Sequence, residues 1–244
     1  MKTALVLTLF VSAGFAGTAS AQTVDEIIAK SLAARGGIEK LRAIRSMVKT
    51  ESLSTPDGRG APLTVRLLRP GRIREELTLG GRRTVRAFDG QSGWIQNPGP
   101  PGTAVRPLTD GDLDELRDEG ENGIDGVLAD YAAKGSRIEF AGTQTVDGRP
   151  CYKLKVTLRT GHIQYQYIDT RTYLEVRAEL LGTMDGKPSA VEQTISDYRD
   201  EGGVLFAHSI VSVIRGQPER SRLTIQRIEL NPPIDERIFS APRR

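Results

Sequence analysis

Apolar residues recur at two different periods along this chain, and the change of period separates helical from extended segments. Over residues 24–32 the apolar positions follow helical spacing, and Thr23 with Glu26 fits a capping box in front of them. Gly36 is a natural end for this helix. Residues 38–44 repeat the spacing over a shorter length, which predicts a second short helix or turn.

From Ser46 onward the period becomes two, which indicates β-strands. Leu63, Val65 and Leu67 alternate with their neighbours in one such run. Turn signals such as Pro70-Gly71 separate successive runs. After Gly135 the alternation resumes and continues to residue 230. The pattern predicts about eleven strands that follow one another as an antiparallel meander.

The stretch between the two extended regions, residues 108–135, returns to helical spacing. Thr109 and Asp112 are candidate caps for a first helix in this stretch. A second helical piece is predicted from an apolar stripe at Ile124, Val127, Leu128 and Tyr131.

Charged residues occupy alternate positions in many of the strands, so one face of the sheet is expected to be exposed to solvent and the other to be apolar. A sheet of this size curls, and its apolar face needs a cover, which the helical segments supply. The predicted fold class is therefore mainly β (α+β), a strongly curved antiparallel sheet with helices on the concave apolar face. No repeat or long linker divides it, so residues 22–244 are expected to form a single domain.

The inward-facing positions follow from the alternation, because successive side chains of a strand point to opposite faces. We expect twelve residues to point toward the helices: Leu63, Val65, Leu67, Val85, Ile95, Leu154, Val156, Tyr165, Tyr167, Leu174, Val176 and Ile195.

The first 21 residues have the composition of a signal peptide. Lys2 is followed by an apolar or small-residue run, and Ala19-Ser20-Ala21 fits the cleavage rule. Since Gln22 and not cysteine follows, we expect a soluble, exported, non-lipidated protein that begins at Gln22 and lies in the periplasm. The alternative is a buried N-terminal strand. No later stretch approaches the length of a membrane helix.

Charge and cysteine content narrow the possible functions. The formal net charge is +3, with Arg and Lys interspersed among Asp and Glu, whereas nucleic-acid binding proteins cluster basic residues with aromatics. We therefore expect no nucleic-acid partner. Cys151 is the one cysteine, so no intrachain disulfide forms, and we expect its thiol to be buried and inert.

Catalytic and metal-binding motifs are missing from the sequence. His162 and His208 are the two histidines, and each lies in a strand pattern, where a structural role is the usual one. Three arginines lie close together at Arg82, Arg83 and Arg86. They could bind an anionic head group or lie on a solvent-exposed strand face, and we favour the solvent-exposed face. The chain is thus expected to be no enzyme, with no cofactor and no metal.

A more specific pattern runs from residue 69 to residue 98: Arg69-Pro70, then Asp89-Gly90, Trp94 and Asn97-Pro98. It resembles the core of the LolA-like periplasmic lipoprotein carriers. The later stretches VLFAHSI and ELNPPIDERIFSAP are similar to the end of the related outer-membrane lipoprotein-sorting proteins. The resemblance covers most of residues 22–244. It implies an unclosed half-barrel whose helical lid covers an apolar cavity for lipoprotein acyl chains or other lipids.

The resemblance also implies a role for Arg69, at the position of a family arginine that holds the lid by hydrogen bonds. Asp89-Gly90 favours a tight turn, and Trp94 suits either a core anchor or a cavity wall. The candidate ligand contacts, on the cavity wall or the lid, are Leu63, Val65, Leu67, Arg69, Val85, Trp94, Ile95, Leu154, Val156, Tyr165, Tyr167, Leu174 and Val176.

Three functions remain open at this point. The first is a non-enzymatic, monomeric carrier of lipid or lipoprotein acyl chains, with envelope membrane proteins as possible partners. The second is a cell-envelope interaction module with the same fold and no ligand. The third is a secreted hydrolase, which the lack of a motif disfavours.

Overall fold

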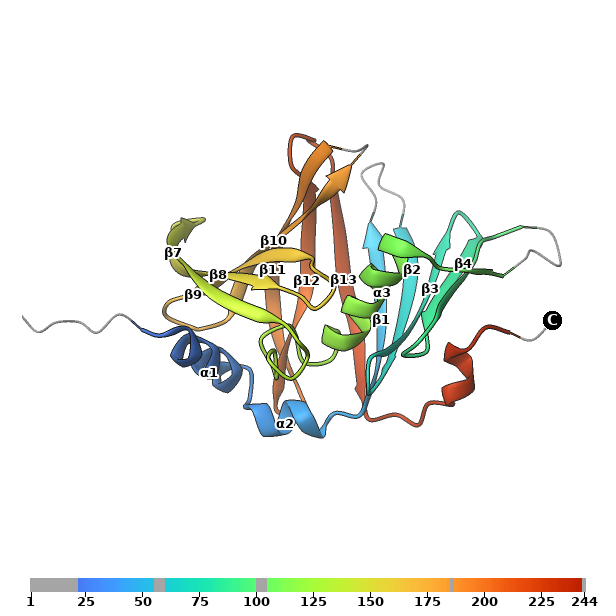
Figure 1. The fold of residues 1–244 in the computed structure, drawn as a ribbon, viewed down its shortest axis with the longest axis horizontal. Helices are drawn as coiled ribbons and strands as arrows, with labels where there is room; N and C mark the ends of the chain where they lie inside the picture. Colours follow the sequence, from blue (N-terminus) through green and yellow to red (C-terminus); the bar gives the residue numbers. More distant parts are fainter. Residues whose placement is uncertain (1–21, 55–59, 100–104, 185–186, 243–244) are drawn as a thin grey trace, which may run out of the picture.

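The computed structural model describes residues 22–54, 60–99, 105–184 and 187–242. These residues form one thirteen-stranded antiparallel sheet, three α-helices and a short 3-10 helix (Figure 1). The strand order is β6-β5-β4-β3-β2-β1-β13-β12-β11-β10-β9-β8-β7. Since β6 and β7 are its two edges, the sheet is not closed into a barrel. The expected fold class is confirmed, with two strands more than the expected eleven or so.

The signal peptide lies outside the described residues. The helices are α1 (Val24–Ala34), α2 (Ile38–Ala43), α3 (Asp110–Asn122) and the 3-10 helix η1 (Glu236–Phe239). The strands are β1 (Ser46–Ser54), β2 (Gly60–Leu68), β3 (Arg72–Leu79), β4 (Arg82–Phe88), β5 (Gly93–Gln96), β6 (Arg106–Pro107), β7 (Arg137–Val146), β8 (Arg149–Thr157), β9 (Ile163–Asp169), β10 (Glu175–Met184), β11 (Lys187–Glu201), β12 (Val204–Ile214) and β13 (Arg220–Leu230).

Helix α1 begins at the expected capping box. The Thr23 hydroxyl accepts a hydrogen bond from the Glu26 backbone N–H at 3.2 Å, and the Glu26 carboxylate accepts one from Thr23 N–H at 3.1 Å. The chain turns at Gly36, whose φ is +113°. A Cβ atom at Gly36 would lie 2.2 Å from the carbonyl oxygen of Gly203, so only glycine fits between α1 and the β11–β12 turn.

The second helical piece expected around residues 124–131 does not form. After α3 the chain runs to residue 135 in turns, and Gly126 and Asp130 have φ of +82° and +51°, which no α-helix contains. Ile124, Val127 and Leu128 are nevertheless buried. The apolar stripe therefore identified buried positions correctly. The segment forms turns and not a helix because Gly126 and Asp130 have left-handed backbone conformations.

Side chains of residues paired across neighbouring strands point to the same face of the sheet, so the register assigns every strand residue to a face. We call the face that carries Leu67 and Leu154 the inner face, because it packs against the helices. The helical layer consists of α1, α2, α3 and the segment 123–135. The opposite, outer face is partly covered by η1, near the C-terminal end of the chain.

Candidate ligand-binding face

Helix α3 covers the inner face of the strands from β1 to β5. Leu116 packs into one buried cluster with Leu67 and Ile73, and all three are at most 2% exposed. The close approach requires glycine, because a Cβ atom at Gly120 would lie 2.3 Å from the carbonyl oxygen of Gly71. This part of the inner face is therefore filled by protein.

Helix α1 and the segment 123–135 cover the inner face at the other end of the sheet. Ile27 of α1 and Val127 share a buried cluster with Leu154 and Val156 of β8 and Ile168 of β9. Leu154, Val156 and Ile168 have no exposed surface. This second covered part is also a packed core.

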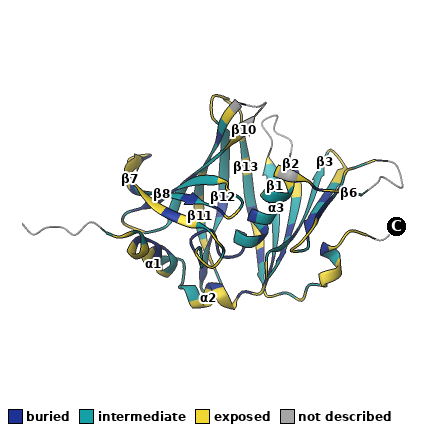
Figure 2. Cartoon of the chain, in the orientation of Figure 1, coloured by how far each residue is buried: buried dark blue, intermediate teal, exposed yellow. Residues whose placement is uncertain are grey.

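Between the two covered parts, the inner face carries aliphatic side chains that are only half-buried. In Figure 1 the upper halves of β10 to β13 stand clear of the helices, and Figure 2 colours them mostly as intermediate. We call the seven residues concerned the open strip: Leu53, Leu180, Val191, Ile195, Ile210, Ile214 and Leu223. Their register joins them across β10, β11, β12, β13 and β1.

Six of the candidate ligand contacts lie on the inner face. Leu63, Val65 and Leu67 of β2 and Ile95 of β5 belong to the cluster under α3, and Leu154 and Val156 belong to the one under α1. They face the helices as expected. Ile195 also points inward, in the open strip. Whether any of these residues binds a ligand stays a prediction.

Five of the candidate ligand contacts lie on the outer face. Val85 and Trp94 pack together there, and Tyr165, Tyr167 and Val176 form another outer cluster with Cys151. The reason in β9 is plain from the register. Gln166 pairs with Leu154, so the glutamines point inward and the tyrosines outward. The alternation correctly separated the two faces of β9. The face that carries the tyrosines, however, is the outer face of the sheet.

Leu174 lies outside the sheet, in the turn before β10. Its carbonyl oxygen accepts a hydrogen bond from the backbone N–H of Asp169 at 3.0 Å, and its side chain is half-buried. It belongs to none of the buried clusters of the described residues. Cys151 is buried as expected.

Trp94 is a core anchor and no cavity wall. Its indole N–H donates to the carbonyl oxygen of Phe239 at 2.7 Å, which ties η1 to the outer face. The preceding Asp89-Gly90 pair forms a tight turn, with φ of +100° at Gly90. The Asp89 carboxylate accepts hydrogen bonds from the backbone N–H groups of Gln91 and Ser92.

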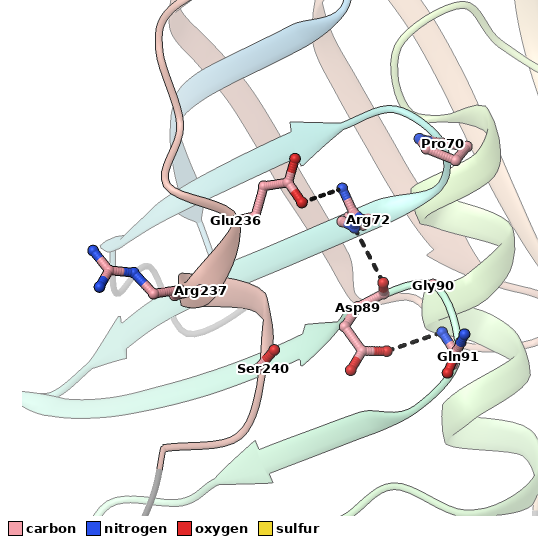
Figure 3. A pocket seen from close by; sticks show the side chains of 8 residues that line it. All are labelled: Pro70, Arg72, Asp89, Gly90, Gln91, Glu236, Arg237 and Ser240. Carbon is pink, nitrogen blue, oxygen red and sulfur yellow. Dashed lines mark hydrogen bonds and ion pairs between the residues drawn. The ribbon is translucent and has the colours of Figure 1, made fainter.

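A polar pocket of about 460 Å³ lies beside this turn (Figure 3). The Arg72 guanidinium contacts the Glu236 carboxylate at 3.1 Å and donates to the Asp89 carbonyl oxygen at 3.2 Å. These contacts join η1 to the start of β3. We therefore assign the pocket a structural role.

Arg69 joins the end of β2 to the helical layer. Its guanidinium donates to the carbonyl oxygens of Ile44 at 2.8 Å and Leu41 at 3.3 Å, both at the C-terminal end of α2. It also donates to the Asp125 carboxylate at 2.7 Å. The resemblance implied hydrogen bonds of this kind, and a planar fork of donors suits the unpaired carbonyls of a helix end.

Asp125 has no exposed surface and is the centre of this polar connection. The Lys134 ammonium lies 2.6 Å from its other carboxylate oxygen, and Arg35 donates to its backbone carbonyl oxygen at 2.6 Å. Burial lowers the pKa of Lys134, while the Asp125 charge opposes that shift. Sequence reasoning missed Asp125, Lys134 and Arg35, because nothing in their local pattern distinguishes them from other charged residues.

Two further sets of contacts attach α3 to the sheet. The buried Asp118 carboxylate lies 2.6 Å from Nδ1 of His162 and accepts from the Thr160 hydroxyl at 2.7 Å. At the other side, Arg86 of β4 contacts Glu119 at 3.2 Å. His162 therefore links the β8–β9 turn to α3, a role its strand pattern did not reveal.

Several polar groups lie buried on or beside the inner face. Glu51 is 1% exposed, and Lys49 lies 3.3 Å from its Oε1 atom. Oε1 of Glu175 is buried with no hydrogen-bond partner among the described residues. This burial raises the pKa of Glu175 to about 7, although the Arg35 charge lowers it. His208 is buried with its Nδ1 2.9 Å from the carbonyl oxygen of Ile225, as a structural strand histidine.

A groove of about 880 Å³ runs outside the inner face, between α1, α2 and the segment 128–133. Its floor is apolar, with Leu32 and Leu128 among small alanine side chains, and Lys40 and Arg42 lie at its rim. Within the described ranges, no group of three or more His, Cys, Asp or Glu is placed to hold a metal ion. In the same ranges no helix is long and apolar enough to cross a bilayer.

Together the sheet and its helical layer define an unclosed antiparallel half-barrel with a partly covered inner face. No protein-family model and no curated protein matches the sequence. Solved structures do share the fold. A structure described as an outer membrane lipoprotein-sorting protein domain from Vibrio parahaemolyticus matches with a TM-score of 0.56 at 11% identity, over 88% of this chain and 94% of that one.

Two further structures match equally well. A LolA superfamily protein from Nitrosomonas europaea has a TM-score of 0.57 at 14% identity, over 91% of this chain and 99% of that one. A DUF1329 family protein from Desulfovibrio piger has a TM-score of 0.56 at 12% identity, over 89% and 97%. The resemblance to the lipoprotein carriers is thereby confirmed for the fold.

Proposed function

We propose that this protein is a non-enzymatic periplasmic carrier that binds lipid or lipoprotein acyl chains on the inner face of its half-barrel. The observation that carries the proposal is the open strip, seven aliphatic side chains left half-buried beside a packed helical layer. Apolar side chains that lie together on one face and are not fully covered suit contact with an apolar ligand. The fold shared with a lipoprotein-sorting domain supports the same reading.

The helical layer supplies a means to cover a bound chain. Besides the two buried apolar clusters, polar contacts attach it to the sheet, and the Arg69–Asp125 pair is among them. Each such contact contributes only about 1–3 kcal/mol. The Arg69 contacts can therefore open while the apolar clusters under α1 and α3 keep the domain folded, which suits uptake and release.

The test is native mass spectrometry of the protein purified from its own periplasm. Bound lipid in the wild type and its loss in Ile210→Asp, within the open strip, are expected. Val211→Asp is the matched control, because Val211 is the next residue of β12 and points to the outer face. A wild-type protein free of lipid, which also binds no fluorescent apolar probe, contradicts the proposal. The same sample shows whether the mature chain begins at Gln22.

The apolar groove beside α1 supports the second function considered, an interaction module of the cell envelope. That function needs no open strip. Loss of a partner on substitution of Ala33→Glu at the groove, with lipid binding retained, would favour it.

A further inference from the structure

A row of mainly polar side chains crosses the inner face; its members are half-buried from β11 to β13 and buried in β9 and β10. In register, Gln166 pairs with Ala178, Ala178 with Gln193, Gln193 with Ser212, and Ser212 with Ser221. All five residues therefore point inward, from β9 to β13. We call the four that carry amide or hydroxyl groups the polar track.

Aliphatic rows flank the polar track on both sides. Leu180, Val191 and Ile214 form one row, and Ile195, Ile210, Leu223 and Leu53 form the other. Same-face neighbours along a strand lie about 7 Å apart. The open face is thus banded, with a line of hydrogen-bonding groups between two lines of hydrocarbon.

Buried acceptor atoms without a hydrogen bond lie at this face as a second observation. Gln166 is 6% exposed, and its Oε1 atom has no hydrogen-bond partner in the described part of the chain. Oε1 of Glu51, two residues along β1 from Leu53, is likewise buried without a hydrogen bond, and Lys49 lies 3.3 Å from it. The Glu51 oxygen has the Lys49 charge beside it, whereas the Gln166 oxygen accepts hydrogen bonds, so the partner that satisfies it carries an O–H or N–H.

We propose that the inner face from β9 to β13 binds an amphipathic lipid whose apolar skeleton carries hydroxyl or amide donors near its middle. A plain hydrocarbon chain would cover Gln193 and Ser212 and leave their polar groups unpaired, which opposes binding. A ligand with donors pairs with the polar track and places its apolar parts on both rows. This inference rests on the proposed function and names its ligand class.

The experiment compares two probes of equal chain length, methyl 10-hydroxystearate with one hydroxyl near the middle of the chain and methyl stearate with none. Each displaces a fluorescent apolar probe from the full mature chain. We expect methyl 10-hydroxystearate to act at a roughly five- to tenfold lower concentration, the value of about one hydrogen bond. In Gln193→Leu and in Ser212→Ala this preference should shrink or reverse. In Thr194→Val, an exposed outer-face change on the same strand, it should persist.

The outcomes separate this inference from the proposed function. Equal displacement by the two probes, or a preference unchanged in both Gln193→Leu and Ser212→Ala, overturns the inference and leaves the carrier proposal standing. If the fluorescent probe binds nowhere and neither lipid is retained, both fall together. Melting temperatures of the three variants within a few degrees of wild type show that the fold is retained.

Discussion

The covered and open parts of the inner face belong to one sheet and follow one alternation, yet they differ in burial. Under α1, Leu154 and Val156 have no exposed surface, whereas Val191 and Ile210 in the open strip are half-buried. Length explains the difference. The thirteen residues of α3 span about 20 Å, while the fifteen residues of β11 span about 50 Å. A layer of short helices leaves part of such strands uncovered.

The largest difference between the two parts should come from one substitution made in each. Val156→Asp places a carboxylate in a packed core without a partner, and we expect a loss of about 4 kcal/mol or more in unfolding free energy. Val191→Asp in the open strip should cost less than about 1 kcal/mol, since its carboxylate reaches water. Urea denaturation measures both. Equal losses would mean that the open strip is as well packed as the core.

A buried carboxyl should make stability depend on pH. Folding raises the pKa of Glu175 from 4.5 to about 7. The folded chain therefore binds this proton more tightly than the unfolded chain, and the stability gained is present below about pH 4.5 and lost as pH rises through about 7.

Glu175→Gln keeps the shape and removes the charge. At about 1.4 kcal/mol per pKa unit, the variant should be more stable than wild type by up to about 3 kcal/mol at pH 8 and similar to it at pH 4. Denaturation midpoints at pH 4, 6 and 8 provide the measurement. Glu192→Gln, on the exposed rim of β11, is the control and should show no such change. A stability difference between Glu175→Gln and wild type that stays constant from pH 4 to pH 8 would contradict the raised pKa of Glu175.

Arg69 lies at the edge of the covered part and connects the end of β2 to the helical layer. Arg69→Leu removes the fork and leaves Asp125 with Lys134 as its charged partner. We expect a loss of about 1–3 kcal/mol and faster release of a bound apolar probe, with the fold retained. Arg69→Lys keeps the charge but not the planar fork, so it should also change release. Identical release rates in wild type and Arg69→Leu would rule out a role in closing the helical layer, and exposed Arg45→Leu is the matched control.

The sequence predicts the strands well because their alternation and glycine turns are local signals. It also places α1, through its capping box, and the buried positions at Ile124 and Val127. The helix expected there fails because Gly126 and Asp130 adopt left-handed conformations, and the apolar spacing carries no sign of them.

The local sequence of a strand does not determine which of its two faces packs against the helices. Tyr167 was expected inward and Trp94 was a candidate cavity wall, but both lie on the outer face, where Trp94 contacts η1 and Tyr167 packs with Cys151. In β9 the inner face receives glutamines instead. The Arg69 contacts were predictable through the family resemblance, whereas Asp125 is reached only through the three-dimensional fold.

The smallest predicted effect concerns the rim of the covered part, where His162 joins the β8–β9 turn to α3. The Asp118 carboxylate has two partners there, the His162 ring at 2.6 Å and the Thr160 hydroxyl at 2.7 Å. His162→Ala removes one of them and leaves the other, and the His162 side chain is 46% exposed. Water therefore replaces part of the lost contact, and we expect a cost of only about 0.5–1 kcal/mol. Hydrogen exchange should show faster opening of α3 and unchanged protection of β11 and β12. Faster exchange in β11 as well would mean that the rim supports the open strip, so that the two parts of the inner face unfold as one unit.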